Sequence, residues 1–127
     1  MIALKDPAII EDYHAHVYYD PATSRERAAR LREQVAQAFP QAKLGRWHDE
    51  LVGPHTRSMY QVAFPRDLFA SLLPWLMLNR DGLTILLHPG TDNPYADHTD
   101  HAAWLGGTLP LKTEVLRGGP TAPTSKA

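Results

Sequence analysis

The residues with the clearest chemical potential in this sequence are two histidines that stand two positions apart. His14 and His16 lie in residues 13–19, which read Tyr-His-Ala-His-Val-Tyr-Tyr. Side chains alternate across a β-strand, so His14, His16 and Tyr18 should share one face of a strand here. Histidine is the commonest metal ligand and its neutral form is available near pH 7. Two imidazoles on one strand face can therefore converge on one metal ion.

Two later segments place a further histidine each on the same face of the expected sheet. Residues 55–64 and 83–88 alternate between apolar side chains and a second set, which contains His55 in the first segment and His88 in the second. The strand at residues 13–19 should lie between these two strands. For any one histidine, a solvated strand face is the simpler interpretation. Together they lead us to predict that His16, His55 and His88 form a metal cluster, with His14 as the next candidate.

The elements that must position these side chains follow the order β-α-β-β-α-β, a ferredoxin-like α+β arrangement. We expect both helices to cover one face of an antiparallel sheet and to leave the histidines on the other face. Thr23 and Glu26 have the capping-box spacing at the start of the first helix, and Pro74 predicts a kink or break near Ser71 in the second. The expected strands are residues 13–19, 44–51, 55–64 and 83–88.

A polar segment, residues 90–107, is too long for a simple connection, and loops of this length are usually functional or disordered. It contains His98 and His101. We expect the segment to close over bound substrate, with Trp104 as its hydrophobic anchor. The alternative is a helix N-terminus that begins near His98. Residues 109–116 could add a last strand or cover the sheet.

Composition limits the classes of function. A chain of 127 residues fits one domain, which we place at residues 1–117, followed by a flexible tail at 118–127. The net charge of −1 gives no electrostatic reason to expect nucleic acid or an anionic membrane as a partner. The absence of cysteine leaves histidine and carboxylate as the metal ligands. No apolar run approaches membrane-spanning length, so we expect a cytoplasmic protein.

Several short motifs, taken in order, resemble those of the DOPA 4,5-dioxygenase family. They are His-Ala-His-Val-Tyr-Tyr-Asp at residues 14–20, Gly-Pro-His at 53–55, Leu-Pro-Trp-Leu at 73–76, Leu-His-Pro at 87–89, Asp-His at 97–98 and Trp-Leu-Gly at 104–106. The resemblance implies extradiol cleavage of DOPA or a related catechol by dioxygen. It also implies a ferredoxin-like fold that can pair into a dimeric α+β barrel. Apolar side chains among the polar ones on the histidine face, including Met59 and Leu86, likewise favour a homodimer.

This resemblance suggests roles for the remaining candidates. The cofactor would be a divalent metal, most readily Fe(II), with Mn or Zn as alternatives. No carboxylate is clearly placed on the histidine face, since the nearest candidate, Glu50, lies in the weakly alternating segment 44–51. We therefore expect an all-histidine site. His98 and His14 would move protons, and Tyr18 would hydrogen-bond oxygen or substrate.

Arg57 and His101 are the candidate substrate-binding residues, because an arginine can hold a substrate carboxylate by two hydrogen bonds. Two other functions stay open at this point. One is a non-catalytic small-molecule-binding module, and the other is a metal-free isomerase or lyase that uses histidine acid–base chemistry.

Overall fold

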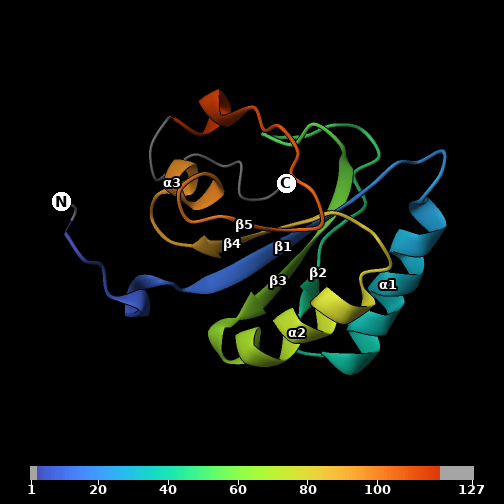
Figure 1. Ribbon diagram of the computed structural model, residues 1–127, viewed down its shortest axis with the longest axis horizontal. Helices are drawn as coiled ribbons and strands as arrows, with labels where there is room; N and C mark the ends of the chain where they lie inside the picture. The colour runs from blue at the N-terminus through green and yellow to red at the C-terminus, as the bar shows by residue number, and fades with distance from the viewer. Residues whose placement is uncertain (1–2, 118–127) are drawn as a thin grey trace.

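The sheet of this protein is antiparallel, five-stranded and open, with the histidine-bearing strand at its centre. The computed structural model describes residues 3–117, and the predicted tail lies outside them. The strand order is β2-β3-β1-β4-β5 (Figure 1). The strands are β1 (Asp12–Tyr19), β2 (Lys43–Leu44), β3 (Ser58–Pro65), β4 (Ile85–Gly90) and β5 (Ala103–Leu105). The predicted ferredoxin-like α+β class is confirmed, and the sheet of this chain does not close into a barrel.

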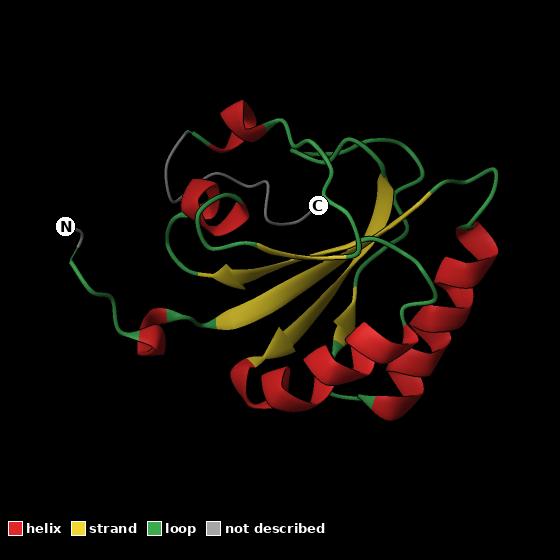
Figure 2. Cartoon of the chain, viewed as in Figure 1, coloured by secondary structure: helices red, strands yellow, loops and turns green. Residues whose placement is uncertain are grey.

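Two helices cover one face of the sheet, as the alternation in the strands predicted (Figure 2). They are α1 (Arg25–Ala38) and α2 (Phe69–Asn79). The core between helices and sheet is apolar and includes Val17, Tyr60, Ile85, Leu31 and Leu76. No described helix has the length and apolar character needed to cross a bilayer. This layer holds β1, β3 and β4 rigidly, which fixes the backbone beneath the opposite face.

Three local predictions about these elements are wrong in whole or in part. Of the expected strand 44–51 only Leu44 lies in a strand, β2, and His48 adds an isolated bridge to Met59, because the alternation of this segment is weak. The N-cap of α1 is Ser24 rather than Thr23, and the Ser24 hydroxyl accepts a bond from the Asp20 N–H instead of capping the helix. The helix α2 runs through Pro74 without the expected break, since burial of its apolar side against the sheet outweighs one lost backbone bond, and a kink near Ser71 stays a prediction.

The other face of the sheet is covered by the chain itself. The short helix α3 (Pro94–His98) and the residues that follow the edge strand β5, up to residue 117, fold over it (Figure 1). Tyr18, Met59 and Leu86 are buried there, packed against partly buried side chains that include Trp104, Leu109 and Leu111. These are the apolar residues that favoured a homodimer from the sequence. A homodimer stays a prediction, but this argument for it is removed.

One buried hydrogen bond joins β3 to α1 and gives a test of this packing. The Tyr60 hydroxyl donates to the carbonyl of Ala28 at 2.7 Å, and Tyr60 is fully buried. We expect Tyr60→Phe to lower the free energy of unfolding by about 1 kcal/mol, measured by urea denaturation. Tyr95→Phe is the control, because within residues 3–117 the Tyr95 hydroxyl accepts a hydrogen bond only from the exposed Arg117. Equal losses in both variants would contradict this role for Tyr60.

Candidate metal centre

Four buried histidine rings gather on the sheet face opposite α1 and α2. His16 comes from the middle of β1, His88 from β4, His98 from the end of α3 and His55 from the loop before β3. Their residues are 0%, 2%, 3% and 1% exposed, respectively. The ring centroids of His16 and His55 are 4.3 Å apart, and those of His88 and His98 are 4.0 Å apart. Four buried imidazoles in mutual contact need a chemical reason, since each ring carries two polar nitrogens.

These four histidines and the neighbouring His14 make up two groups of three, and in each group one ring nitrogen of every member lies within 4.8 Å of the others. One is His14, His16 and His88, and the other is His16, His55 and His98. Both could hold a metal ion, and His16 belongs to both. The set predicted from the sequence, His16, His55 and His88, is split between them. The loop histidine His98, which we expected to act from a lid, lies inside the second group.

Two backbone carbonyls fix the orientation of two of these rings. Nδ1 of His88 lies 2.8 Å from the carbonyl oxygen of Pro89, and Nδ1 of His98 lies 2.7 Å from that of Pro94. A carbonyl oxygen only accepts, so Nδ1 carries the proton in both rings. In the neutral ring this leaves a lone pair on Nε2. A hydrogen bond from the other ring nitrogen is the usual way that proteins orient metal-ligating histidines.

The second group, His16, His55 and His98, has the unpaired ring nitrogens that a metal site requires. Each of its members keeps one buried ring nitrogen without a hydrogen-bond partner among the described residues: Nδ1 of His16, Nε2 of His55 and Nε2 of His98. Buried polar atoms are nearly always paired, so three unpaired nitrogens within this one group fit a metal site. His88 differs, because its Nε2 lies 3.0 Å from Nε2 of His16. The donor set is nitrogen only, which suits Fe, Zn and similar transition metals.

Burial keeps these imidazoles neutral, as metal ligation requires. Removal from water, reinforced by the neighbouring histidines, holds the pKa values of His16 and His88 well below the usual histidine range. Burial lowers the pKa of His55 to about 3, with His98 and His48 adding to the effect. The pKa of His98 is also lowered by burial. At neutral pH the cluster therefore offers lone pairs rather than positive charges.

The lowered pKa of His55 makes the metal-free protein sensitive to acid. Below the unfolded value of 6.5 and above about 3, the unfolded chain binds a proton that the folded chain does not. Stability should therefore be full above pH 6.5 and fall as the pH drops toward 3. Because several histidines contribute, we expect urea unfolding at successive pH values to show a loss above about 1.4 kcal/mol per pH unit. His55→Gln should reduce this slope, and an unchanged slope would contradict the assignment.

The Tyr18 hydroxyl forms a hydrogen bond with the His55 ring. The hydroxyl oxygen lies 2.7 Å from Nδ1 of His55, and this contact leaves Nε2 as the unpaired nitrogen of that ring. Tyr18 is 4% exposed and its ring stacks on Trp104 at 6.0 Å. Burial raises the pKa of the Tyr18 hydroxyl. Tyr18 therefore positions His55 in this structure and does not line either cavity next to the cluster.

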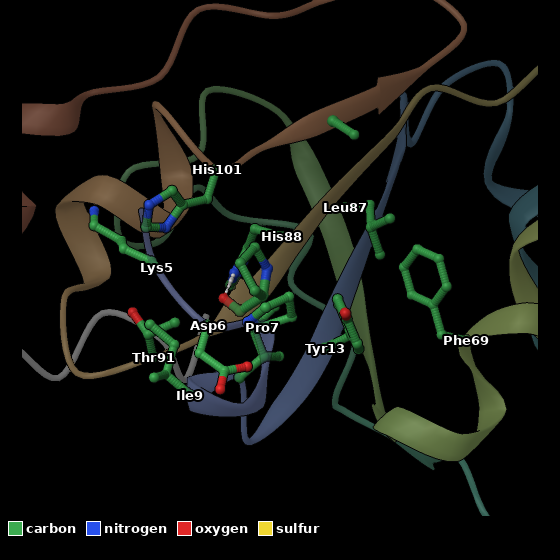
Figure 3. A pocket seen from close by; sticks show the side chains of 13 residues that line it. Lys5, Asp6, Pro7, Ile9, Tyr13, Phe69, Leu87, His88, Thr91 and His101 are labelled. Carbon is green, nitrogen blue, oxygen red and sulfur yellow. Dashed lines mark hydrogen bonds between the residues drawn. The ribbon is translucent and has the colours of Figure 1, made fainter. Parts of the chain in front are cut away.

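Two cavities adjoin the cluster and share the wall formed by His88, Pro89 and Thr91. The smaller, about 310 Å³, is lined by His14, His88 and His98 and so reaches three histidines. The larger, about 390 Å³, touches only His88 of the four buried rings. Its wall is largely apolar. Figure 3 shows one end formed by Tyr13, Phe69 and Leu87, and the other by Lys5, Thr91 and His101.

The remaining candidate residues lie in different places. The Asp97 carboxylate is 2% exposed and accepts bonds from the Thr91 backbone, the Thr91 hydroxyl and Nδ1 of His101. His14 borders the smaller cavity with its Nε2 3.4 Å from the Asp12 carboxylate. Arg57 is exposed and borders neither cavity, but a separate hollow beside Tyr18.

Comparison with known proteins places this cluster in a family. The model of the Dopa 4,5-dioxygenase family matches residues 13–115, which include every histidine of the cluster. The chain belongs to the Dopa 4,5-dioxygenase family. The resemblance seen in the short motifs is thereby confirmed, and family membership supports a role as an oxidoreductase of the dioxygenase type.

Individual proteins that are similar to this chain support the family assignment. A DOPA 4,5-dioxygenase from Amanita muscaria is 34% identical over 84% of this chain and 50% of its own length. An uncharacterized 21.2 kDa protein from Botryotinia fuckeliana is 30% identical over 88% of this chain and 67% of its own. The chain thus spans half to two thirds of these relatives. A crystal structure from Nostoc punctiforme, described as a candidate dioxygenase, is 49% identical, with a TM-score of 0.87 over 90% of this chain and 97% of its own.

The sequence did not reveal four contributors to this site in the roles that they have. In the sequence Asp97 enters only as part of the Asp-His motif at residues 97–98, yet its carboxylate binds Thr91 and His101, and its i, i+4 spacing to His101 is the signal that could have found it. The carbonyls of Pro89 and Pro94 carry no side-chain signal. The Asp12 carboxylate contacts the His14 ring. The signal for this contact is strand parity, because Asp12 lies two residues before His14 and so shares its face of the strand.

Proposed function

We propose that this chain is a metal-dependent extradiol dioxygenase that opens the ring of DOPA or a related catechol. The observation that carries the proposal is the buried group of His16, His55 and His98, each with an unpaired ring nitrogen, of which His98 borders the smaller cavity. Family membership supplies the dioxygenase class. In this proposal these three histidines hold the metal, and His88 lies beside it as the alternative third ligand.

The reaction needs an open-sided metal and a group that moves protons. A bound Fe(II) ion would hold a catecholate and dioxygen in neighbouring positions and mediate electron transfer between them. Both oxygen atoms enter the product as the carbon–carbon bond beside a hydroxyl-bearing carbon breaks, so no external reductant is needed. The chain's own residues bind the ring, exclude water and accept the catechol proton.

His14 is placed to accept that proton. It borders the cavity, and its Nδ1 is unpaired among the described residues. Burial lowers the pKa of His14, and the nearby Asp12 carboxylate opposes this shift. A neutral imidazole next to a carboxylate can take a proton and share the resulting charge with it. His98, the sequence-based choice for this role, borders the same cavity and is the alternative base.

Metal reconstitution tests the proposed reaction. Protein purified without a histidine tag is loaded anaerobically with Fe(II), Mn(II) or Zn(II) and mixed with DOPA in air. We expect oxygen uptake and a yellow product with Fe(II), and binding without turnover with Zn(II), which has no redox chemistry. Tight Fe(II) binding with no oxygen uptake across a panel of catechols would overturn the proposal in favour of a non-catalytic binding module.

A further inference from the structure

The larger cavity is bordered by a histidine that belongs to neither metal group. His101 lines this cavity, and Nδ1 of His101 lies 3.0 Å from a carboxylate oxygen of Asp97. The Asp97 side chain is only 4% exposed and also accepts bonds from the backbone N–H and the hydroxyl of Thr91, at 2.8 Å and 2.7 Å. Three hydrogen bonds thus hold this buried carboxylate in place, and the carboxylate in turn orients the His101 ring.

The bond to Asp97 determines which nitrogen of His101 is available to a ligand. A carboxylate only accepts hydrogen bonds, so Nδ1 carries the proton in the neutral ring and Nε2 keeps a lone pair. Nε2 has no hydrogen-bond partner among residues 3–117, and the His101 side chain is 26% exposed. A buried carboxylate behind an imidazole whose second nitrogen is free is the arrangement of an acid–base pair.

The rest of this cavity suits a conjugated molecule with a negative charge. Apolar and aromatic side chains, among them Tyr13, Phe69 and Leu87, form one end of the space of about 390 Å³, and Lys5 lies at the other end with His101 (Figure 3). Lys5 forms no ion pair within the described part of the chain, so its charge is available to an anion. Because the two cavities share a wall, a molecule formed in the smaller one lies next to the larger one.

Opening a catechol ring beside a hydroxyl-bearing carbon gives a molecule of this kind. The product of catechol itself is an open six-carbon chain that carries a new carboxylate, a hydroxyl on the adjacent, doubly bonded carbon and an aldehyde at the far end. The hydroxyl is an enol. Its conversion to a ketone requires that one proton leave the oxygen and one arrive at carbon, which is work for an acid–base group.

We propose that His101, oriented by Asp97, converts the enol of the ring-opened product to its keto form in the larger cavity. This inference rests on the proposed ring-cleavage function and adds a second activity to it. Nε2 takes the proton from the enol oxygen and delivers it to the carbon next to the former enol carbon. The double bond between these two carbons becomes single, the carbon–oxygen bond becomes double, and no oxidant or reductant is consumed. Lys5 binds the carboxylate of the chain by charge-assisted hydrogen bonds.

A preformed product tests this step apart from the dioxygenase reaction. The yellow ring-opened product of catechol is made with a separate extradiol dioxygenase, freed from that enzyme and added to the metal-free full-length protein. Loss of the conjugated enol removes the yellow absorbance, which therefore follows the step. We expect a rate that saturates with product concentration and exceeds the rate in buffer by about 10²–10⁴-fold. A rate equal to that in buffer would overturn the inference.

Substitutions at the two ends of the functional wall separate proton transfer from binding. His101→Phe keeps a ring but removes the nitrogen, and it should lower kcat by about 10²-fold or more. Lys5→Gln should raise KM severalfold with kcat almost unchanged, because Lys5 binds the carboxylate and moves no proton. His48→Phe is the control, since His48 is partly buried and lines neither cavity, and it should change neither constant. An unchanged kcat in folded His101→Phe protein would overturn the inference.

Asp97→Asn tests the orienting role of the carboxylate. The asparagine amide can donate to Nδ1 of His101, which moves the ring proton to Nε2 and removes the lone pair from the cavity. We expect kcat to fall while KM stays within about twofold, because the cavity wall is unchanged. A wild-type kcat in this variant would contradict the orienting role.

Failure of this inference and failure of the proposed function appear in different measurements. Oxygen uptake by Fe(II)-loaded protein reports on ring cleavage, whereas the preformed product reports on the second step alone. Rapid loss of the yellow product without any oxygen uptake would support this inference and overturn ring cleavage. Oxygen uptake whose yellow product persists equally long in unaltered and His101→Phe protein would overturn this inference and leave ring cleavage in place.

Discussion

Replacing His16 by alanine should remove nearly all bound metal and, with it, all catechol-dependent oxygen uptake. His16 is the only histidine that belongs to both groups of converging ring nitrogens among the described residues, so no complete group survives its loss. Loss of a group that merely supports a metal ligand already lowers metal affinity about 10–100-fold, and loss of a direct ligand should cost more. The measurement is metal content by mass spectrometry on protein whose fold is verified by circular dichroism.

The same strand face provides a matched control. His14→Ala removes a histidine two residues away from His16 but leaves His16, His55 and His98 intact, so its metal content should match that of the unaltered protein. His16→Phe is a second test variant that keeps the buried volume filled if the alanine variant folds poorly. Full metal occupancy in folded His16→Ala and His16→Phe protein would refute the assignment. Metal loss in His55→Ala but not in His88→Ala would favour the group that contains His98.

The second large effect concerns proton transfer by His14. Positioned acid–base groups typically contribute about 10²–10⁴-fold to rate, and we expect His14→Ala to lose kcat on this order while it keeps its metal. The check is oxygen uptake at saturating catechol, together with metal content. Loss of activity should be smaller at high pH, because the catechol ionises in solution and needs the base less.

His98 provides the contrasting result. If His98 is a ligand, His98→Ala loses metal and activity together. A His98→Ala variant that retains its metal but is inactive, beside a fully active His14→Ala variant, would exchange the two roles and restore His98 as the proton shuttle. The two single variants therefore decide between ligand and base without assuming either.

The sequence predicted the parts of this site that lie on regular strands. Alternation along β1 correctly placed His14 and His16 on the face opposite the helices, and the register confirms it, since His14 pairs directly with His88. Such predictions succeed because strand parity follows from backbone geometry alone. The same geometry buries Val17 and Tyr60 beneath α1 and α2.

The parts contributed by loops could not be predicted in this way. His55 precedes β3 and touches the last segment only through an isolated bridge to Leu111, so strand parity does not govern it. His98 ends a five-residue helix that begins at an Asn93 cap, and nothing in the spacing shows that this helix turns inward. The chain closes over its own sheet through Trp104, a long-range contact that a local pattern cannot reveal.

The contact between His16 and His88 joins positions 72 residues apart in the chain. An unfolded chain cannot hold such distant residues together, so the cluster exists only once β1 and β4 have paired. A metal that binds this cluster would therefore add to the stability of the native state alone, by about 2.7 kcal/mol at a free concentration one hundred times its dissociation constant. Newly made chains would then persist in proportion to the supply of the ion, and metal starvation would appear first as reduced abundance of the protein.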